Sequence, residues 1–291
     1  MHKDKIINAF KIYLNKDEVN LEYQERFLGG MSNYTYHVKV NGKDYVIRIA
    51  NKEGKVFVDY ATEKLHLFLL EPFNITSKTL FYDTDTGIKI SEYIPGDNLT
   101  ATLSAEDYAG VARALHKLHA LNIEGVDYGQ IDRLARYESL VEKHLTPEYF
   151  ELKAFWMNEN STTYKDADIV FTHGDAQRTN IVKNGDSYTL VDFEFAGMND
   201  RYFDIASFGN INFSDSLNLL DYYLGRKALP HEVRRVKFHR LFQVLQWHVV
   251  ALQKHLNGQS EKLLIDFKKY SDNYLAFAAY LATKIKALPI K

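Results

Sequence analysis

A Pro95-Gly96 pair separates two stretches of the chain that carry different secondary-structure signals. Before the pair, residues 22–50 and 79–94 contain short apolar runs bounded by turn residues, which is typical of β-strands. Asn41-Gly42 lies between two of these runs and tolerates the positive φ angles of a tight hairpin turn. Proline and glycine together interrupt regular structure. The sequence therefore predicts a β-rich region that ends at this pair.

Outside these strand-like runs, both before and after the Pro95-Gly96 pair, apolar residues recur at helical spacing. This spacing predicts helices at residues 1–14, 59–70, 104–121, 131–144 and from about 214 to the end. We therefore expect an α+β fold with two lobes. The small N-terminal lobe spans residues 1–94, and the larger, mainly helical C-terminal lobe spans residues 95–291.

The composition limits the kinds of partner and chemistry. The 36 Lys and Arg residues nearly balance the 38 Asp and Glu residues, so a net charge of -2 gives no reason to expect nucleic acid or an anionic membrane. The chain has no cysteine, which excludes disulfides and Cys-ligated metals. We see no secretory signal, and the apolar stretch at 274–282 is too short to span a bilayer. We expect a cytoplasmic protein, and its oligomeric state stays open.

Two polar clusters form the strongest functional signal. Residues 173–180 read His-Gly-Asp-Ala-Gln-Arg-Thr-Asn, and residues 192–194 read Asp-Phe-Glu. Each cluster lies beside a short apolar run, at 169–171 and 188–191, and we expect these runs to be strands of one hairpin. The two clusters would then converge at one end of that hairpin.

The residue types in these clusters suit phosphoryl transfer. That reaction needs a carboxylate to receive the proton of the attacking hydroxyl group, and oxygen ligands to hold Mg²⁺ against the phosphates of ATP. Asp175 suits the first role, while Asn180 and Asp192 suit the second, with Glu194 close by. The alternative is that these are polar residues capping turns and helices. His173 is expected to be a buried hydrogen-bonding residue rather than a ligand or base.

A second signal lies at the start of the β-rich region. Gly29, Gly30, Ser32 and Asn33 lie between two predicted strands. Glycines there would let the backbone approach phosphate groups closely, and the polar side chains could donate hydrogen bonds. A Gly-Gly hairpin turn would look the same in sequence.

Arg48 and Glu63 form a third signal. Arg48 lies on a predicted strand and Glu63 on the helix that follows, so an ion pair between them could hold the α- and β-phosphates. A solvated surface pair is the alternative, and Glu53 is a rival partner for Arg48. Further along, the backbone of Glu92 and Ile94 could bind adenine where the last predicted strand ends, although a plain strand end would read the same.

These motifs together resemble the choline/ethanolamine kinase branch of the aminoglycoside-phosphotransferase-like kinases, and bacterial choline kinases in particular. The most specific part is Asp192-Phe-Glu-Phe-Ala-Gly-Met-Asn-Asp200, which continues to Phe203-Asp-Ile-Ala206. The resemblance implies a bilobal protein-kinase-like fold. It also implies that Asp175 is the catalytic base, that Asn180 and Asp192 bind Mg²⁺, and that Asp204 braces the catalytic loop.

The same resemblance points to the acceptor site. Gln177 stands two residues after the base, and Phe195 stands where tyrosine is common. Glu194 is also expected on the acceptor side. Trp247 matches one aromatic wall of a choline site, but Val250 replaces a second tryptophan. Core packing is the alternative role for Phe195 and Trp247.

The sequence thus predicts an ATP-dependent kinase of a small alcohol, with choline as the leading acceptor. Ethanolamine, thiamine, a sugar alcohol or an aminoglycoside are alternatives on the same fold. A catalytically inactive nucleotide-binding module is a further alternative, against which the presence of Asp175, Asn180 and Asp192 argues.

Overall fold

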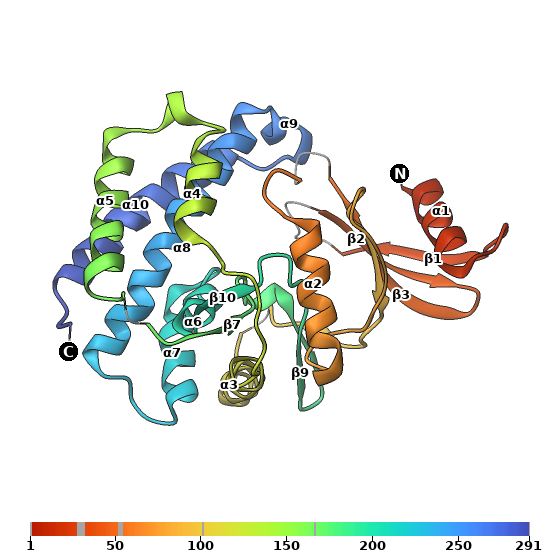
Figure 1. Cartoon of the computed structure of the whole chain (residues 1–291), viewed down its shortest axis with the longest axis horizontal. Coiled ribbons are helices and arrows are strands. Elements are labelled where there is room, and N and C mark those ends of the chain that lie inside the picture. The colour runs from red at the N-terminus through yellow and green to blue at the C-terminus, as the bar shows by residue number, and fades with distance from the viewer. Residues whose placement is uncertain (1, 28–32, 52–54, 101, 166, 291) are drawn as a thin grey trace.

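The computed structural model describes residues 2–27, 33–51, 55–100, 102–165 and 167–290. A β-sheet lies at one end of the molecule and a body of helices at the other (Figure 1). The sheet has five antiparallel strands in the order β1-β2-β3-β5-β4. Their bounds are Leu21–Arg26 (β1), Asn33–Val40 (β2), Lys43–Ala50 (β3), Thr79–Asp83 (β4) and Ile88–Glu92 (β5). The β-rich character predicted for the N-terminal region is confirmed.

The turn between β2 and β3 is the predicted hairpin. Val40 pairs with Lys43, so Asn41 and Gly42 alone make the connection. Both have positive φ angles, 49° for Asn41 and 76° for Gly42. Asparagine and glycine are the residues that adopt this conformation most readily.

Two helices flank the sheet. Helix α1 (Lys3–Leu14) buries Ile6 and Phe10 against the sheet on its outer side (Figure 1). Helix α2 (Tyr60–Leu70) lies between the sheet and the helical body, and the short 3₁₀ helix η1 (Glu71–Phe73) follows it. The apolar residues of α2 belong to the core of the helical body, so α2 joins the two parts of the molecule. Whether residue 94 is the lobe boundary stays a prediction.

The helical body contains the remaining helices. Their bounds are Ala105–His119 (α3), Gln130–Glu138 (α4), Pro147–Thr162 (α5), Tyr202–Phe208 (α6), Phe213–Leu224 (α7), Pro230–Leu256 (α8), Gln259–Leu263 (α9) and Phe267–Lys286 (α10), with 3₁₀ helices at Glu142–His144 (η2) and Arg178–Asn180 (η3). Within the described ranges, no helix is long and apolar enough to cross a membrane.

The prediction for residues 169–191 was wrong in its pairing. Strand β7 (Ile169–Thr172) pairs with β10 (Gly197–Asp200), whereas β9 (Ser187–Leu190) pairs with β8 (Ile181–Asn184) and lies in another sheet with β6 (Asp97–Asn98). The reason is a tight turn with Gly185 at φ = 57°, which makes 181–190 a hairpin by itself. The two polar clusters still meet, because they flank the open end of this β8–β9 hairpin.

Candidate active site

The loop after β7 is held in place by its backbone. The carboxylate of Asp204, on α6, accepts hydrogen bonds from the backbone N–H groups of His173 (2.7 Å) and Gly174 (2.9 Å). Gly174 has φ = +78°, and a Cβ atom there would lie 1.9 Å from the carbonyl oxygen of Phe195. Glycine is therefore required at this close approach. The side chain of Asp175 takes no part in this anchor.

His173 is fully buried and uses both ring nitrogens for hydrogen bonds. Its Nε2 donates to the carbonyl of Val191 at 2.9 Å, and its Nδ1 accepts from the N–H of Asp175 at 3.2 Å. These contacts agree with the expectation of a buried hydrogen-bonding residue. They also tie the two polar clusters together, because Val191 directly precedes Asp192.

The two carboxylate oxygens of Asp175 have different surroundings. Oδ2 accepts hydrogen bonds from the side-chain amides of Gln177 (2.8 Å) and Asn180 (3.2 Å). Among the residues that the structure describes, Oδ1 has only a long contact, 3.4 Å from the hydroxyl group of Ser207. Burial raises the pKa of Asp175 to about 6, although His173 and Gln177 act to lower it. A carboxylate is suited to general base catalysis when its pKa lies near neutrality and one of its oxygens makes only a long hydrogen bond.

Asn180 and Asp192 present oxygen atoms of the kind that Mg²⁺ prefers. The amide nitrogen of Asn180 donates to Asp175, which leaves its amide oxygen for another partner. The side chain of Asp192 is 38% exposed, and its φ angle of 67° is uncommon for a residue other than glycine. The N–H of Val191 donates to the Asn180 carbonyl at 2.9 Å, so the two residues lie close together.

This donor set fits a nucleotide-bound Mg²⁺. The described residues contain no group of three or more acidic or histidine side chains that could hold a metal by themselves. Mg²⁺ that accompanies a nucleotide needs only one or two protein oxygens, since phosphates and water supply the other ligands.

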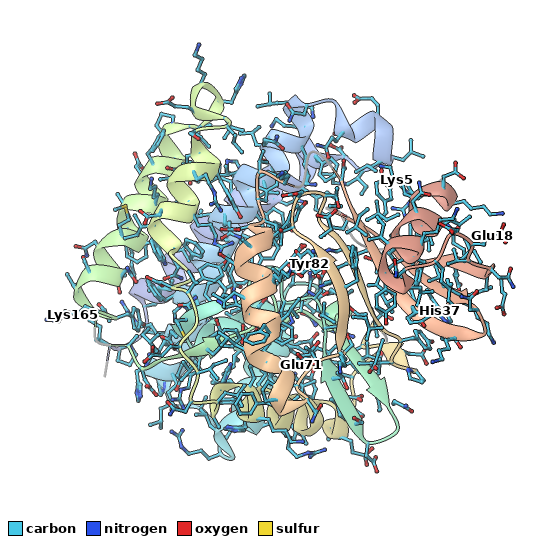
Figure 2. The ribbon with its side chains drawn as sticks, turned by 45° about the vertical axis from the view of Figure 1, so that its right-hand side comes forward. Lys5, Glu18, His37, Glu71, Tyr82 and Lys165 are labelled. Carbon is cyan, nitrogen blue, oxygen red and sulfur yellow. The ribbon has the colours of Figure 1, made fainter. Side chains whose placement is uncertain are left out.

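Arg48 is the centre of a buried ion cluster. Its guanidinium group binds both carboxylate oxygens of Glu63, with Nη1–Oε1 at 2.9 Å and Nη2–Oε2 at 2.7 Å. Lys89, the cross-strand neighbour of Arg48, contacts the same carboxylate at 2.6 Å. Tyr82 lies between the sheet and α2 (Figure 2) and donates to Glu63 at 2.6 Å. Burial by itself would raise the pKa of Glu63, but the two cations outweigh it and lower the pKa to about 2.

Arg48 also connects the sheet to the second polar cluster. Its Nη1 lies 3.4 Å from Asp192 and 3.2 Å from Glu194. Glu194 is buried and accepts a hydrogen bond from the side chain of Asn33 at 2.7 Å. Burial, with Asp192 adding to it, raises the pKa of Glu194 well above its usual value. The structure therefore places Glu194 with two residues predicted to bind phosphate, although the sequence had suggested the acceptor side.

Part of the predicted nucleotide site lies outside the described residues. Gly29, Gly30 and Ser32 fall there, as does Glu53, the rival partner of Arg48. The structure therefore leaves the glycine loop as a prediction.

The structure limits which backbone groups of Glu92 and Ile94 could bind adenine. The N–H of Glu92 already donates to the carbonyl of Lys78 at 3.0 Å. The N–H of Ile94 has no hydrogen-bond partner among the described residues. Adenine binding here would therefore use the carbonyl of Glu92 and the N–H of Ile94.

A crevice between α8 and α10 is lined mainly by aromatic and apolar side chains. It is formed by Trp247, Val250, Ala251, Lys254, Phe267, Tyr270 and Tyr274. The ring of Trp247 meets Phe195 edge to face, with the ring centroids 6.0 Å apart. Phe195 is buried, and the guanidinium carbon of Arg133 lies 5.7 Å from its ring centroid. The structure thus brings the two predicted aromatic residues together, with Phe195 packed behind Trp247.

A comparison of the chain with known protein families gives a match over most of its length. The family described as choline/ethanolamine kinase matches residues 24–214, a span that contains Asp175, Asn180 and Asp192. The chain belongs to the choline/ethanolamine kinase family.

Relatives of this kinase come from bacteria and animals. It is 23% identical over 252 residues to protein LicA of Haemophilus influenzae, covering 80% of this chain and 74% of LicA. It is 25% identical over 296 residues to ethanolamine kinase 2 of Mus musculus, covering 89% of this chain and 76% of that protein. Because it belongs to this family, the chain is a phosphotransferase with an alcohol group as acceptor.

Solved structures share the fold of this kinase. Choline kinase LicA from Streptococcus pneumoniae superposes with a TM-score of 0.77 at 21% identity, over 97% of this chain and 99% of that chain. LicA has also been solved in complex with AMP. The α+β, protein-kinase-like fold predicted from the sequence is confirmed.

Several residues near the site of this kinase could not be predicted from the sequence. Lys89, Tyr82, Tyr270 and Tyr274 lie on ordinary strand and helix patterns, and no local motif marks them. One signal was available for Lys89. A lysine flanked by Ile88 and Ile90 in a buried strand needs a nearby anion, and Glu63 provides it.

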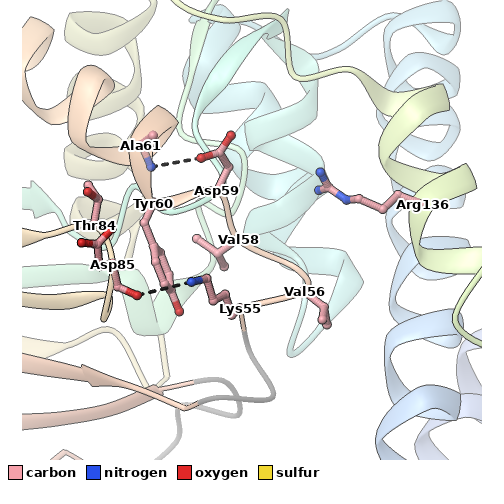
Figure 3. Close-up of a pocket in the computed structure, with 9 residues that line it drawn as sticks. All are labelled: Lys55, Val56, Val58, Asp59, Tyr60, Ala61, Thr84, Asp85 and Arg136. Atoms are coloured by element: carbon pink, nitrogen blue, oxygen red, sulfur yellow. Dashed lines mark hydrogen bonds between the residues drawn. The ribbon is translucent and has the colours of Figure 1, made fainter.

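A separate pocket of the kinase lies at the start of α2 (Figure 3). Asp59 caps the helix by accepting from the N–H of Ala61, and Lys55 donates to the carbonyl of Asp85 at 3.3 Å. Arg136, on α4, forms the opposite wall. None of the predicted site residues that the structure describes lines this pocket.

Proposed function

We propose that this kinase transfers the γ-phosphoryl group of ATP to the hydroxyl group of choline, which gives phosphocholine and ADP. The observation that carries the choice of choline is the set of aromatic side chains around Trp247, Tyr270 and Tyr274. The crevice between them encloses only about 10 Å³, so these side chains must move apart to admit a trimethylammonium group. A trimethylammonium group has no N–H to donate, so it is recognised by shape and by aromatic faces. Each good cation–π contact contributes about 0.5–2 kcal/mol.

The residues around Asp175 supply the proposed chemistry. As the hydroxyl oxygen of the acceptor forms its bond to the γ-phosphorus, the bond between that phosphorus and the leaving oxygen of ADP breaks, and the hydroxyl proton passes to Asp175. Asn180 and Asp192 would hold Mg²⁺, which neutralises charge on the phosphates when bound. Arg48, fixed by Glu63, would hold phosphate oxygens. Gln177 would orient the base.

The remaining nucleotide contacts in the proposal come from the sequence. The loop of Gly29, Gly30 and Ser32 would cover the phosphates, with Asn33 at its end. Adenine would contact the backbone of Glu92 and Ile94. We also propose that the kinase works in the cytoplasm, where ATP is available.

The charge around the crevice bears on the competing acceptors. Among the described residues that line it there is no carboxylate, and Lys254 is one of them. An aminoglycoside carries several positive charges and would need several carboxylates, which argues against it. Ethanolamine has an ammonium group whose N–H donors an aromatic crevice leaves unpaired. Val250 leaves more space than a second tryptophan would.

A panel of acceptors tests this proposal. We expect kcat/KM with ATP to be higher for choline than for ethanolamine, thiamine or kanamycin. Trp247→Ala should raise the KM for choline about 3- to 30-fold, the equivalent of a lost cation–π contact, and leave the KM for ATP unchanged. Tyr280→Ala serves as the control, because Tyr280 is an exposed aromatic on α10 that does not line the crevice. If another alcohol is phosphorylated and choline is not, choline is the wrong acceptor and the kinase assignment stands.

A further inference from the structure

Arg240 on α8 is a buried cation with an unusual set of partners. The residue is 2% exposed, and no carboxylate of the described residues forms an ion pair with it. Its Nη2 donates to the side-chain oxygen of Asn210 at 3.0 Å, and its Nη1 donates to that of Gln243 at 3.2 Å. A buried guanidinium group that no carboxylate contacts directly is costly, which points to a role for Arg240 through the residues that its partners touch.

Asn210 continues the contact toward the catalytic base. Its amide nitrogen donates to the side-chain oxygen of Gln177 at 2.8 Å. The amide nitrogen of Gln177 donates in turn to Oδ2 of Asp175, also at 2.8 Å. Consecutive hydrogen bonds therefore link Arg240, Asn210, Gln177 and Asp175, and we name this series the amide relay.

The direction of every bond in the amide relay follows from its two ends. A guanidinium group can only donate hydrogen bonds, and an ionised carboxylate can only accept them. Asn210 must therefore turn its oxygen toward Arg240 and its nitrogen toward Gln177. Gln177 must then turn its oxygen toward Asn210 and its nitrogen toward Asp175. The carboxylate of Asp175 favours this orientation by itself, and Arg240 adds a second fixed end. Turning both amides would then set an oxygen against the carboxylate and a nitrogen against the cation.

The relay decides which oxygen of Asp175 is available. Gln177 and Asn180 both donate to Oδ2, while Oδ1 has, within the described part of the chain, only the 3.4 Å contact with Ser207. We propose that Arg240 is a positioning residue for the reaction: through Asn210 and Gln177 it fixes the carboxylate of Asp175 so that Oδ1 takes the proton of the acceptor hydroxyl. This inference rests on the proposed role of Asp175 as the base.

Asn210→Asp is the most direct test, because it removes the hydrogen-bond donor of residue 210 and preserves the shape of the side chain. An aspartate at position 210 still accepts from Arg240, and gains an ion pair with it, but cannot donate to Gln177. Gln177 is then free to turn its oxygen toward Asp175, which repels the carboxylate. We expect kcat to fall about 10- to 100-fold, as misplacement of a reacting group does. The KM for ATP should stay within about twofold, since the nucleotide contacts lie elsewhere, and thermal stability should not fall.

Substitutions of Arg240 provide an independent test should Asn210→Asp fold poorly. Arg240→Met removes the donor-only end of the relay and should lower kcat as Asn210→Asp does. Arg240→Lys keeps a donor-only cation and should recover most of the lost kcat. Gln243→Met is the matched control: it removes the other contact of Arg240, which is not part of the relay, and should leave the kinetic constants unchanged.

The outcomes separate this inference from the proposed function. If Asp175→Asn abolishes turnover while Asn210→Asp and Arg240→Met keep normal kcat, the relay is overturned and the base assignment stands. If Asp175→Asn keeps normal kcat, both fall. A loss of kcat in Arg240→Met that Arg240→Lys does not recover would also overturn the relay, because it would indicate a purely structural role.

Discussion

At the scale of single residues, Asp175 is set apart by burial together with the unequal use of its two oxygens. Among the described residues, side-chain amides donate to its carboxylate only at Oδ2, and burial disfavours its charge. Such a group gains stability when it accepts a proton from a substrate. The same reasoning would not apply to an exposed aspartate, whose charge water already stabilises.

Asp175→Asn should therefore lower kcat by about 10²–10⁴-fold, the usual contribution of a general base. An asparagine keeps the size of the side chain but cannot take the proton. The affinity for ATP, measured by calorimetry, should stay close to that of the unmodified protein. Asp186→Asn is the control, because Asp186 lies exposed in the β8–β9 turn. Normal turnover by Asp175→Asn would show that another group is the base.

The sequence could predict only those site residues that short motifs mark. Asp175, Asn180 and Asp192 lie in two such motifs, and the structure brings them together. Arg240 and Asn210 could not be found in this way, because their proposed role depends on hydrogen bonds between segments that are distant in sequence. The chemical roles of all these residues stay predictions.

At the scale of elements, α2 has a double attachment. Its apolar residues pack into the helical body, while Glu63 on its other side binds Arg48 and Lys89 of the sheet. Glu63 is 1% exposed, so its charge and those of its two partners depend on one another. Removing one partner from a buried ion cluster leaves the others without compensation.

Glu63→Gln should lower the free energy of unfolding by about 3 kcal/mol, in line with the loss of one member of a buried pair. It should also raise the KM for ATP more than the KM for the alcohol, because Arg48 loses its anchor. Urea denaturation and steady-state kinetics measure the two effects.

Glu71→Gln is the matched control for this experiment. Glu71 follows α2 directly, and its pair with Lys78 is exposed, with 3.5 Å between the charged atoms. Exposed pairs contribute only about 0–1 kcal/mol. Equal losses of stability in the two variants would contradict the account of Glu63.

Most elements could be predicted from the period of their apolar residues, and the exceptions have physical reasons. The hairpin at Asn41-Gly42 and the helix at 59–70 carry strong local signals. Helix α5 (Pro147–Thr162) was missed because its apolar residues do not gather on one face; its start depends on Thr146, which caps it, and on Pro147. Strand β8 was missed because Ile181 and Val182 are followed at once by Lys183 and Asn184, which interrupt the apolar run.

At the scale of the whole molecule, His66 joins α2 to the segment before α4. Its Nε2 accepts a hydrogen bond from the N–H of Val126 at 3.0 Å, and the ring is 1% exposed. Burial, with Arg133 adding to it, lowers the pKa of His66 from 6.5 to about 4. The native protein therefore holds this histidine neutral.

Acid should weaken the fold through His66. In the unfolded chain His66 gains a proton near pH 6.5, whereas in the native protein it does so only near pH 4. The unfolded state thus binds more protons between these values, so the stability that His66 contributes is present above pH 6.5 and is lost as the pH falls toward 4. Denaturation curves recorded across this range measure the loss.

His66→Gln should make stability less dependent on pH over the same range, since glutamine can accept from Val126 and does not titrate. His144→Gln is the control, because His144 is exposed and should leave the pH dependence as it is. An unchanged pH dependence in His66→Gln would rule out this histidine as the source.

The bonds from Arg48 to Asp192 and Glu194 join residues 144 and 146 positions apart. During folding, such contacts require the closure of a very long loop, and closure entropy is lost before the contacts form. Arg48, the proposed phosphate-binding cation, and Asp192, the proposed metal ligand, therefore meet only once the sheet has docked on the helical body. We expect nucleotide affinity to be among the last properties regained on refolding, later than the fluorescence of the buried Trp156, so ATP binding reports on the completely folded chain.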